Sequence, residues 1–385
     1  MPARMAKIVL LLLTAGVVGS PAQSLTTLVS FTGTNGAYPT WNPIVQAANG
    51  YLYGMTSNGA LAGGTIYQIS PTNQVSVLYT FCAQPQCADG SNPQGGLAFD
   101  DAGDLYGTTS GGGTEGGGTI FKITTQGVLT TLHDFEYSDG ASPWAGLVYF
   151  GGIFYGTTVS GGSAGNGTIF SITPQGTLTT LYSFCSKPDC KDGYSVTSPL
   201  TAANGILWGT TYFGGTDDVG TIFQITPTGT FTTLRSFDYK NGAQANGGLV
   251  YATDGNFYGT TLHGGDWDDG TGFRLTPTGR LSTVYSFCSV KFCPDGVWPF
   301  GGLIQGANGN LFGTTEAGGT HFQGSIFEIS TTGKLTTLYN FCSETKCADG
   351  SAPQATLVQS TNGNLYGTTS LGGSNNAGTL FQFTP

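Results

Sequence analysis

The stretch GLVYFGGIFYGTTVSGGSAGNGTIFSITPQGTLTTLYSF, residues 146–184, contains four strand-like runs separated by turns. The runs are GLVY (146–149), IFYGTT (153–158), GTIFSI (167–172) and LTTLYSF (178–184). They are rich in Thr, Ile, Leu, Tyr and Phe, which favour β-strands. Gly and Pro between the runs are typical turn residues. The stretch therefore predicts a four-stranded antiparallel sheet with short connections.

This unit recurs along the whole chain. The pattern aromatic-Gly-Met-Thr begins at Tyr53, and six later copies read aromatic-Gly-Thr-Thr, starting at Tyr106, Tyr155, Trp208, Tyr258, Phe312 and Tyr366. Successive copies are 49 to 54 residues apart, a period typical of β-propeller blades. Because each blade lies between two neighbours, several strands need apolar residues on both faces, which explains the weak alternation. The repeats predict an all-β fold, a seven-bladed β-propeller with four-stranded antiparallel blades.

The two ends of the chain predict how the ring closes. The last repeat ends after its third strand-like run, whereas residues 25–31 (LTTLVSF) match the fourth run of the preceding repeat, residues 335–341 (LTTLYNF). We expect this N-terminal strand to complete the last blade and so to remove the open edges of the ring. Residues 23–385 then form a single propeller domain.

The composition and the N-terminal residues indicate the class of protein and its location. The chain has 12% aromatic and only 9% charged residues, so it is not a disordered chain, and its net charge of −10 argues against nucleic-acid binding. Residues 1–22 predict a signal peptide, because Arg4 and Lys7 precede a short apolar core and small residues precede the expected cleavage after Ala22. That core is too short to span a membrane. We expect a secreted monomer, extracellular, at the cell surface or periplasmic, without stable membrane insertion.

The cysteines support export. They form four pairs with the spacing C-x4-C, namely Cys82 and Cys87, Cys185 and Cys190, Cys288 and Cys293, and Cys342 and Cys347. An even number of regularly spaced cysteines in an exported protein predicts disulfides. A metal site would favour shorter spacings and further ligands, and His133, His263 and His321 all lie away from the pairs. We therefore predict four local disulfides that order long loops.

One face of the predicted ring carries the cysteine loops 82–87, 185–190, 288–293 and 342–347, and we call it the stapled-loop face. Shortly after the Asx-Gly turns of this face come residues predicted to lie at the rim of the central channel: Trp41, Gln94, Trp144, Asn246, Phe300 and Gln354. Trp267 lies in a second loop of the same face. Aromatic faces stack on sugars and side-chain amides bind hydroxyl groups, so these seven residues predict ligand binding. Packing between blades is the alternative interpretation of the aromatic residues.

Catalytic chemistry has weak support in the sequence. Acidic residues cluster in two loops of the stapled-loop face, at Asp217, Asp218, Asp266, Asp268 and Asp269. Carboxylates of this kind serve glycoside hydrolysis or bind calcium, but Asp-Asp-Gly is also ordinary turn chemistry. A further set recurs in every repeat and is interpreted as turns: Asn35, Asp89, Asp139, Asp192, Asn241, Asp295 and Asp349. We assign no catalytic residue, metal ligand or cofactor, and keep calcium as the one candidate ion.

The repeat resembles that of a known family. Residues 364–369 (NLYGTT), 220–225 (GTIFQI) and 177–181 (TLTTL) are similar to the GloVer tandem repeat of exported bacterial proteins. That resemblance implies a surface or secreted propeller and brings no catalytic residues. The style of the blade is more distantly similar to streptogramin-lyase-like propellers, which use clustered histidines, acidic residues and a metal. The absence of paired histidines here counts against lyase activity.

The functional hypothesis is accordingly one of binding. We expect a non-enzymatic propeller that binds an extracellular glycan or a cell-surface protein through the stapled-loop face. Two alternatives remain, an extracellular hydrolase or lyase acting on polysaccharide, and a structural envelope protein.

Overall fold

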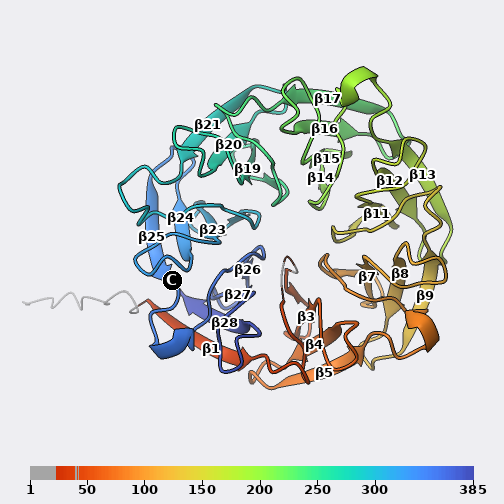
Figure 1. The fold of residues 1–385 in the computed structure, drawn as a ribbon, viewed down its shortest axis with the longest axis horizontal. Coiled ribbons are helices and arrows are strands. Elements are labelled where there is room, and N and C mark those ends of the chain that lie inside the picture. Colours follow the sequence, from red (N-terminus) through yellow and green to blue (C-terminus); the bar gives the residue numbers. More distant parts are fainter. Residues whose placement is uncertain (1–22, 40, 42) are drawn as a thin grey trace, which may run out of the picture.

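The computed structural model describes residues 23–39, 41 and 43–385, and the predicted signal peptide lies outside them. The described residues form seven four-stranded antiparallel sheets, arranged as blades around a central axis (Figure 1). This confirms the all-β, seven-bladed β-propeller. In these ranges no helix has the length and apolar character needed to cross a membrane.

The strands of each blade follow one another from the axis outward. Blade 1 contains β2 (Val45–Gln46), β3 (Leu52–Thr56), β4 (Thr65–Ile69) and β5 (Val75–Thr80), and blade 2 contains β6 (Ala98–Phe99), β7 (Leu105–Thr109), β8 (Thr119–Ile123) and β9 (Leu129–Asp134). Blade 3 contains β10 (Val148–Phe150), β11 (Ile153–Thr157), β12 (Thr168–Ile172) and β13 (Leu178–Ser183), and blade 4 contains β14 (Thr201–Ala203), β15 (Ile206–Thr210), β16 (Thr221–Ile225) and β17 (Phe231–Ser236).

The remaining blades repeat this order. Blade 5 contains β18 (Val250–Tyr251), β19 (Phe257–Thr261), β20 (Thr271–Leu275) and β21 (Leu281–Ser286), and blade 6 contains β22 (Ile304–Gln305), β23 (Leu311–Thr315), β24 (Ser325–Ile329) and β25 (Leu335–Asn340). Blade 7 contains β26 (Val358–Gln359), β27 (Leu365–Thr369), β28 (Thr379–Thr384) and β1 (Ser24–Ser30). Short 3-10 turns lie in three cysteine loops, at Pro85–Cys87, Pro188–Cys190 and Thr345–Cys347.

The N-terminal strand closes the ring, as predicted. β1 pairs antiparallel with β28 from Ser24 opposite Thr384 to Ser30 opposite Thr379. Figure 1 shows β1, in red, at the outer edge of the blade formed by the blue strands β26, β27 and β28. The first and last segments of the chain therefore share one sheet, in which β28 is paired on both sides and β1 forms the outer edge.

The aromatic-Gly-Thr-Thr motif has a packing reason. Gly107 of β7 lies opposite Phe121 of β8, and a Cβ atom at position 107 would lie 2.6 Å from that ring. The glycine thus makes room for the aromatic residue of the next strand. The last threonine, Thr109, shares a buried hydrogen bond of 2.9 Å with the hydroxyl of Thr119. Equivalent hydroxyl pairs occur in all seven blades at 2.7–3.0 Å.

The core consists of repeated contacts at the end of each outer strand. The phenylalanine that follows the outer strand is buried in every blade. Its ring lies 5.1–5.5 Å from the aromatic ring on the third strand of the following blade. In blade 3 this pair is Phe184 with Phe223 of the following blade. Because such pairs link neighbouring blades, burial of apolar area holds the ring together as a whole.

The innermost strands are shorter than predicted. The expected run 146–149 becomes β10 (Val148–Phe150), and no first strand exceeds three residues. The reason is crowding near the axis: a Cβ atom at Gly146 would lie 2.7 Å from the carbonyl oxygen of Gly96 in the neighbouring blade. Residues just before the inner strand therefore pack against the backbone of a neighbouring blade instead of pairing within their own.

Candidate functional site

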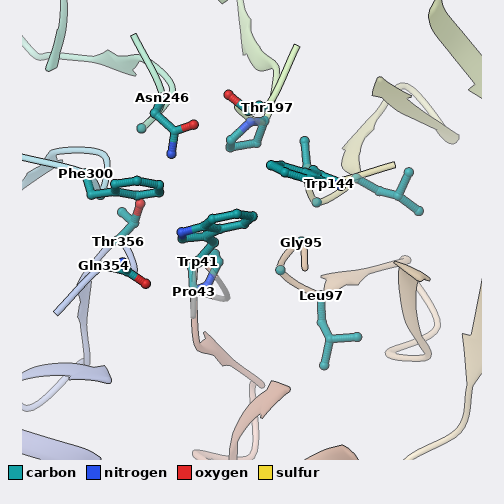
Figure 2. A pocket seen from close by; sticks show the side chains of 17 residues that line it. Trp41, Pro43, Gly95, Leu97, Trp144, Thr197, Asn246, Phe300, Gln354 and Thr356 are labelled. Carbon is teal, nitrogen blue, oxygen red and sulfur yellow. The ribbon is translucent and has the colours of Figure 1, made fainter. Parts of the chain in front are cut away.

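A cavity of about 100 Å³ lies where the connections between blades converge on the central axis. Five of the seven residues predicted to bind a ligand line it, Trp41, Trp144, Asn246, Phe300 and Gln354. They belong to the connections leading into blades 1, 3, 5, 6 and 7. Figure 2 shows the three aromatic rings lying across the axis, with Asn246 on the side away from Gln354. We call these five residues together with Thr197 the axial site.

The aromatic residues of the axial site pack on one another. The ring of Trp41 lies 4.8 Å from that of Trp144, with 35° between the two planes. It lies 5.4 Å from the ring of Phe300, with 11° between those planes. All three side chains remain partly exposed. The arrangement is thus a row of three rings, stacked on one side and accessible in part from the cavity.

Two polar atoms of the axial site lack partners. The indole Nε1 of Trp41 and the hydroxyl of Thr197 are buried without a hydrogen bond to any described residue. Buried polar groups are nearly always paired in folded proteins. The two atoms therefore leave a donor and a hydroxyl available to a small polar group entering the cavity.

The repeat positions place one residue at the axial cavity that was not predicted there, Thr197, and one predicted rim residue, Gln94, outside the lining of the cavity. Thr197 is the fourth residue after the Asp192-Gly193 turn, the same position as Trp144, Asn246, Phe300 and Gln354 in their repeats, so the repeat itself contained the signal. Gln94 also has this position, but it is buried and donates a hydrogen bond to Asn92, while the following glycines line the cavity.

Trp267 does not belong to the axial site. It lies in the connection between β19 and β20, is 64% exposed, and does not line the axial cavity. A ligand role for Trp267 remains a prediction about a separate surface.

A carboxylate stands behind the axial site. Glu316 accepts a hydrogen bond of 2.9 Å from the side-chain amide of Gln354, and burial raises the pKa of Glu316 above its usual range. Other repeats carry Ser, Val, Tyr or Leu at this position, directly after the Gly-Thr-Thr motif. A single charged residue in an otherwise uncharged column of the repeat is the signal that could have identified Glu316.

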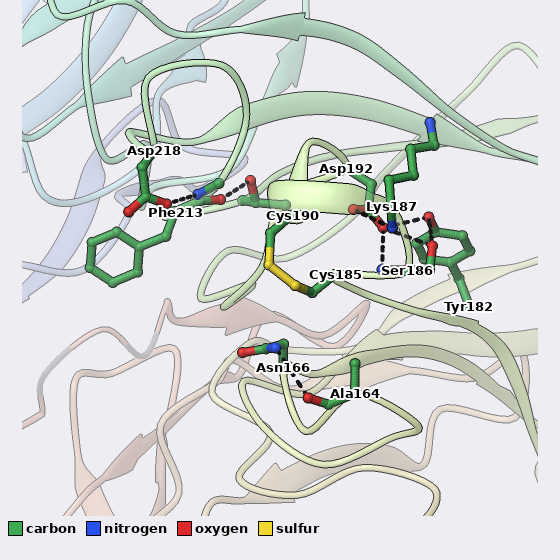
Figure 3. The surroundings of a disulfide bond; sticks show 12 residues. Ala164, Asn166, Tyr182, Cys185, Ser186, Lys187, Cys190, Asp192, Phe213 and Asp218 are labelled. Carbon is green, nitrogen blue, oxygen red and sulfur yellow. Dashed lines mark hydrogen bonds between the residues drawn. A yellow bond between two sulfur atoms is a disulfide. The ribbon is translucent and has the colours of Figure 1, made fainter.

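The stapled loops contain the predicted disulfides and, in addition, a buried aspartate that accepts hydrogen bonds from the loop. All four C-x4-C pairs form disulfides. In the loop of Figure 3 the buried Asp192 accepts hydrogen bonds from the hydroxyl of Tyr182 and from the backbone N–H groups of Ser186 and Lys187. The same tyrosine-to-aspartate bond recurs in the other three stapled loops. These Asp-Gly residues lie in turns, and their carboxylates also anchor the loops.

Disulfides of this kind place the protein in an oxidising compartment, extracellular or periplasmic.

The acidic loops show turn chemistry. Asp218 and Asp268 each accept a backbone N–H within their own loop, from Gly214 at 2.9 Å and Gly264 at 2.8 Å. Asn376 makes the equivalent bond in blade 7, so this contact needs no negative charge. Asp269 lies near the sulfur atoms of Cys288 and Cys293, but those atoms are joined in a disulfide and cannot act as thiolate ligands. Calcium binding stays a prediction without a defined set of ligands.

Comparison with solved structures shows the same fold at low sequence identity. Virginiamycin B lyase from Staphylococcus aureus matches with a TM-score of 0.63 and 14% identity, over 94% of this chain and 99% of that chain. An extracellular domain assigned to a hybrid two-component system of B. thetaiotaomicron matches with a TM-score of 0.61 and 15% identity, over 94% of this chain and 41% of that one. No curated protein matches in sequence.

The repeat itself identifies the family. A family model described as the Gloeobacter/Verrucomicrobia repeat matches residues 17–218, 80–253 and 215–385, which together cover nearly the whole chain. This confirms the resemblance drawn from the Gly-Thr-Thr and Gly-Thr-Ile-Phe motifs. The chain belongs to the Gloeobacter/Verrucomicrobia repeat family.

Proposed function

We propose that the protein is a secreted, non-enzymatic binding protein that holds an extracellular glycan, or a cell-surface component bearing one, at the axial site. The observation that carries this proposal is the convergence of Trp41, Trp144 and Phe300 with the amides of Asn246 and Gln354 around one cavity. Partly exposed aromatic rings offer apolar faces to the C–H groups of a sugar, and amides exchange hydrogen bonds with its hydroxyls.

The size of the cavity limits what enters it. A volume of about 100 Å³ corresponds to roughly three water molecules at about 30 Å³ each. It is smaller than the roughly 300–1,000 Å³ of pockets that enclose drug-sized ligands. We therefore expect the axial site to accept the end of a glycan, one ring edge or a substituent, while the rest of the chain lies across the stapled-loop face.

Several observations favour binding over catalysis. A glycosidase of the usual kind needs two carboxylates flanking the scissile bond, whereas no acidic residue of the described chain lines the axial cavity and Glu316 stands alone behind Gln354. A catalytically inactive form of the virginiamycin B lyase carries a histidine substitution. His133, His263 and His321 all lie outside the lining of the axial cavity here.

The proposal is tested by a glycan-array screen of the exported, disulfide-bonded protein, with and without calcium. Phe300→Ala removes a ring of the axial site, and we expect at least a tenfold loss of binding. Phe322→Ala is the matched control, because Phe322 belongs to the same blade, is 59% exposed and lies away from the cavity. Equal loss in both variants would indicate a general effect on the fold, and unchanged binding by Phe300→Ala would exclude the axial site.

A structural envelope role is the second candidate. It is favoured by one observation, that Trp41 contacts both Trp144 and Phe300 and so helps to close the channel. Absence of binding to every glycan on the array, together with a lower Tm for Phe300→Ala than for Phe322→Ala, would support this second role instead.

A further inference from the structure

A second hollow lies on the stapled-loop face, between blades 3 and 4. Its volume is about 620 Å³, and its lining includes Asn166, Asp189, Lys191, Tyr194 and Asp218. We call it the blade 3–4 groove. Figure 3 shows Asn166, from the loop between β11 and β12, on one side of the Cys185–Cys190 disulfide, and Asp218, from the loop between β15 and β16, on the other. The volume falls within the range of about 300–1,000 Å³ that small-molecule sites occupy.

The repeats act as an internal comparison for this groove. Tyr194 forms a bridge with Phe213, and each of the other blades makes the same bridge with a different residue pair. Those pairs are Ala37 with Asn58, Ser91 with Gly111, Ala141 with Ser160, Ala243 with His263, Val297 with Ala317, and Ser351 with Leu371. None of them contains a benzene ring. Since six blades form the bridge without the aromatic pair, the fold does not require Tyr194 and Phe213 to be aromatic.

The aromatic residues form a platform at the groove. The rings of Tyr194 and Phe213 stack at 5.4 Å with an angle of 26°, and Tyr212 meets Phe213 edge-on at 4.7 Å. Tyr194 is only partly buried and lines the groove. Phe213 therefore supports one face of the tyrosine ring, which fixes its orientation before any ligand arrives and lowers the entropy cost of binding.

Polar groups surround this platform. Asp189 stands at the tip of the disulfide-closed loop with a left-handed φ of 58°, a conformation that the loop imposes on a non-glycine residue. Burial and the neighbouring Asp218 carboxylate raise the pKa of Tyr194, so its hydroxyl stays protonated at neutral pH. The amide of Asn166 and the ammonium of Lys191 add donors. An aromatic plane ringed by carboxylates and an amide matches the alternating C–H and hydroxyl groups of a sugar ring.

We infer that the blade 3–4 groove is a second glycan site, built on Tyr194 and Phe213, for several units of an uncharged saccharide chain. This inference rests on the proposed function, because it assumes that the axial site takes the end of a glycan. The charge of the groove favours a neutral ligand: two carboxylates face one ammonium there, and the protein carries a net charge of −10. Anionic polysaccharides would be repelled both by the carboxylates of the groove and by the net negative charge of the protein.

The test separates the groove from the axial site with variants that the fold already tolerates. Tyr194→Ser introduces the residue that blades 2 and 7 carry at this bridge, as Ser91 and Ser351, so we expect an unchanged Tm. Tyr239→Ser is the control, since Tyr239 is a 54% exposed tyrosine in the connection to blade 5. Titrations with cellohexaose, laminarihexaose and N-acetylchitohexaose, and with the matching disaccharides, are followed by calorimetry, with hexagalacturonate as the acidic probe.

We expect Tyr194→Ser to weaken binding of at least one neutral hexasaccharide about tenfold while leaving the disaccharide unaffected, and Tyr239→Ser to change neither. Phe300→Ala should weaken both lengths. Binding that is sensitive to Phe300→Ala but identical in wild type and Tyr194→Ser would overturn the groove while leaving the proposed function intact. Tighter binding of hexagalacturonate than of the neutral chains would also overturn the inference, and no binding of any probe would overturn both.

Discussion

The hydroxyl group of Tyr182 donates a hydrogen bond of 2.7 Å to Oδ2 of Asp192, ten residues further along the chain. The bond joins the end of an outer strand to the far side of a stapled loop. The disulfide between Cys185 and Cys190 closes the same loop from within. Each stapled loop therefore has two independent constraints, one covalent and one made by a buried carboxylate.

Replacing the carboxylate of Asp192 should destabilise the protein. Asp192→Asn keeps the shape of the side chain but turns an acceptor oxygen into a donor NH2 group facing other donors. Losing hydrogen bonds to a charged acceptor costs about 1.5–3 kcal/mol each time, and we expect the free energy of unfolding to fall by roughly 2 kcal/mol. Urea denaturation measures this. Asp189→Asn in the same loop is the control, because Asp189 is exposed and asparagine tolerates its positive φ.

The contribution of Asp192 to stability should depend on pH. Burial alone would raise the pKa of Asp192, but hydrogen bonds from Tyr182 and Ser186 outweigh burial and leave the pKa below its usual value. The unfolded chain then binds protons more readily than the folded protein, so this stability is present above about pH 4 and is lost as the pH falls through the folded pKa. Urea midpoints between pH 7 and pH 3 should decline less steeply in Asp192→Asn than in wild type, and parallel curves would contradict this assignment.

Glu316 should behave in the opposite sense. Burial raises its pKa, so the folded state favours the protonated acid and loses stability as the pH rises above about 4.5 toward the folded pKa. Glu316→Gln removes this charge and keeps an oxygen acceptor for Gln354. We expect a small gain in stability at pH 7, roughly 0.5 kcal/mol, that disappears at pH 4. A calorimetric Tm at both pH values measures it, and a loss of stability at pH 7 would mean that Glu316 is needed as a carboxylate.

The sequence predicted the ring because the residues that build it recur. Gly107 and Thr109 make contacts within their own blade, so each repeat carries its own packing rule and the number of blades follows from counting. The axial site was harder to predict, because a side chain reaches the axis only if its connection runs that way. Thr197 and Gln94 occupy equivalent repeat positions, yet only Thr197 lines the cavity. Glu316 belongs to blade 6 and accepts a hydrogen bond from Gln354, which lies in the connection into blade 7. No local sequence pattern encodes this contact between neighbouring blades.

Closure by β1 gives the last prediction. Leu25, Leu28 and Val29 pack against the cores on either side of blade 7, and the strand pairs with β28 along its length. Burial of three such side chains contributes about 1.5–3 kcal/mol each at full burial, and they are partly buried here, so removing residues 23–30 should cost roughly 3–6 kcal/mol. It also exposes the edge of β28, which can pair with a second molecule. We expect a lower Tm and concentration-dependent association in light scattering, both reversed by a synthetic peptide of residues 23–30. A truncated protein that remains monomeric with an unchanged Tm would show that the propeller does not depend on this strand for its closure.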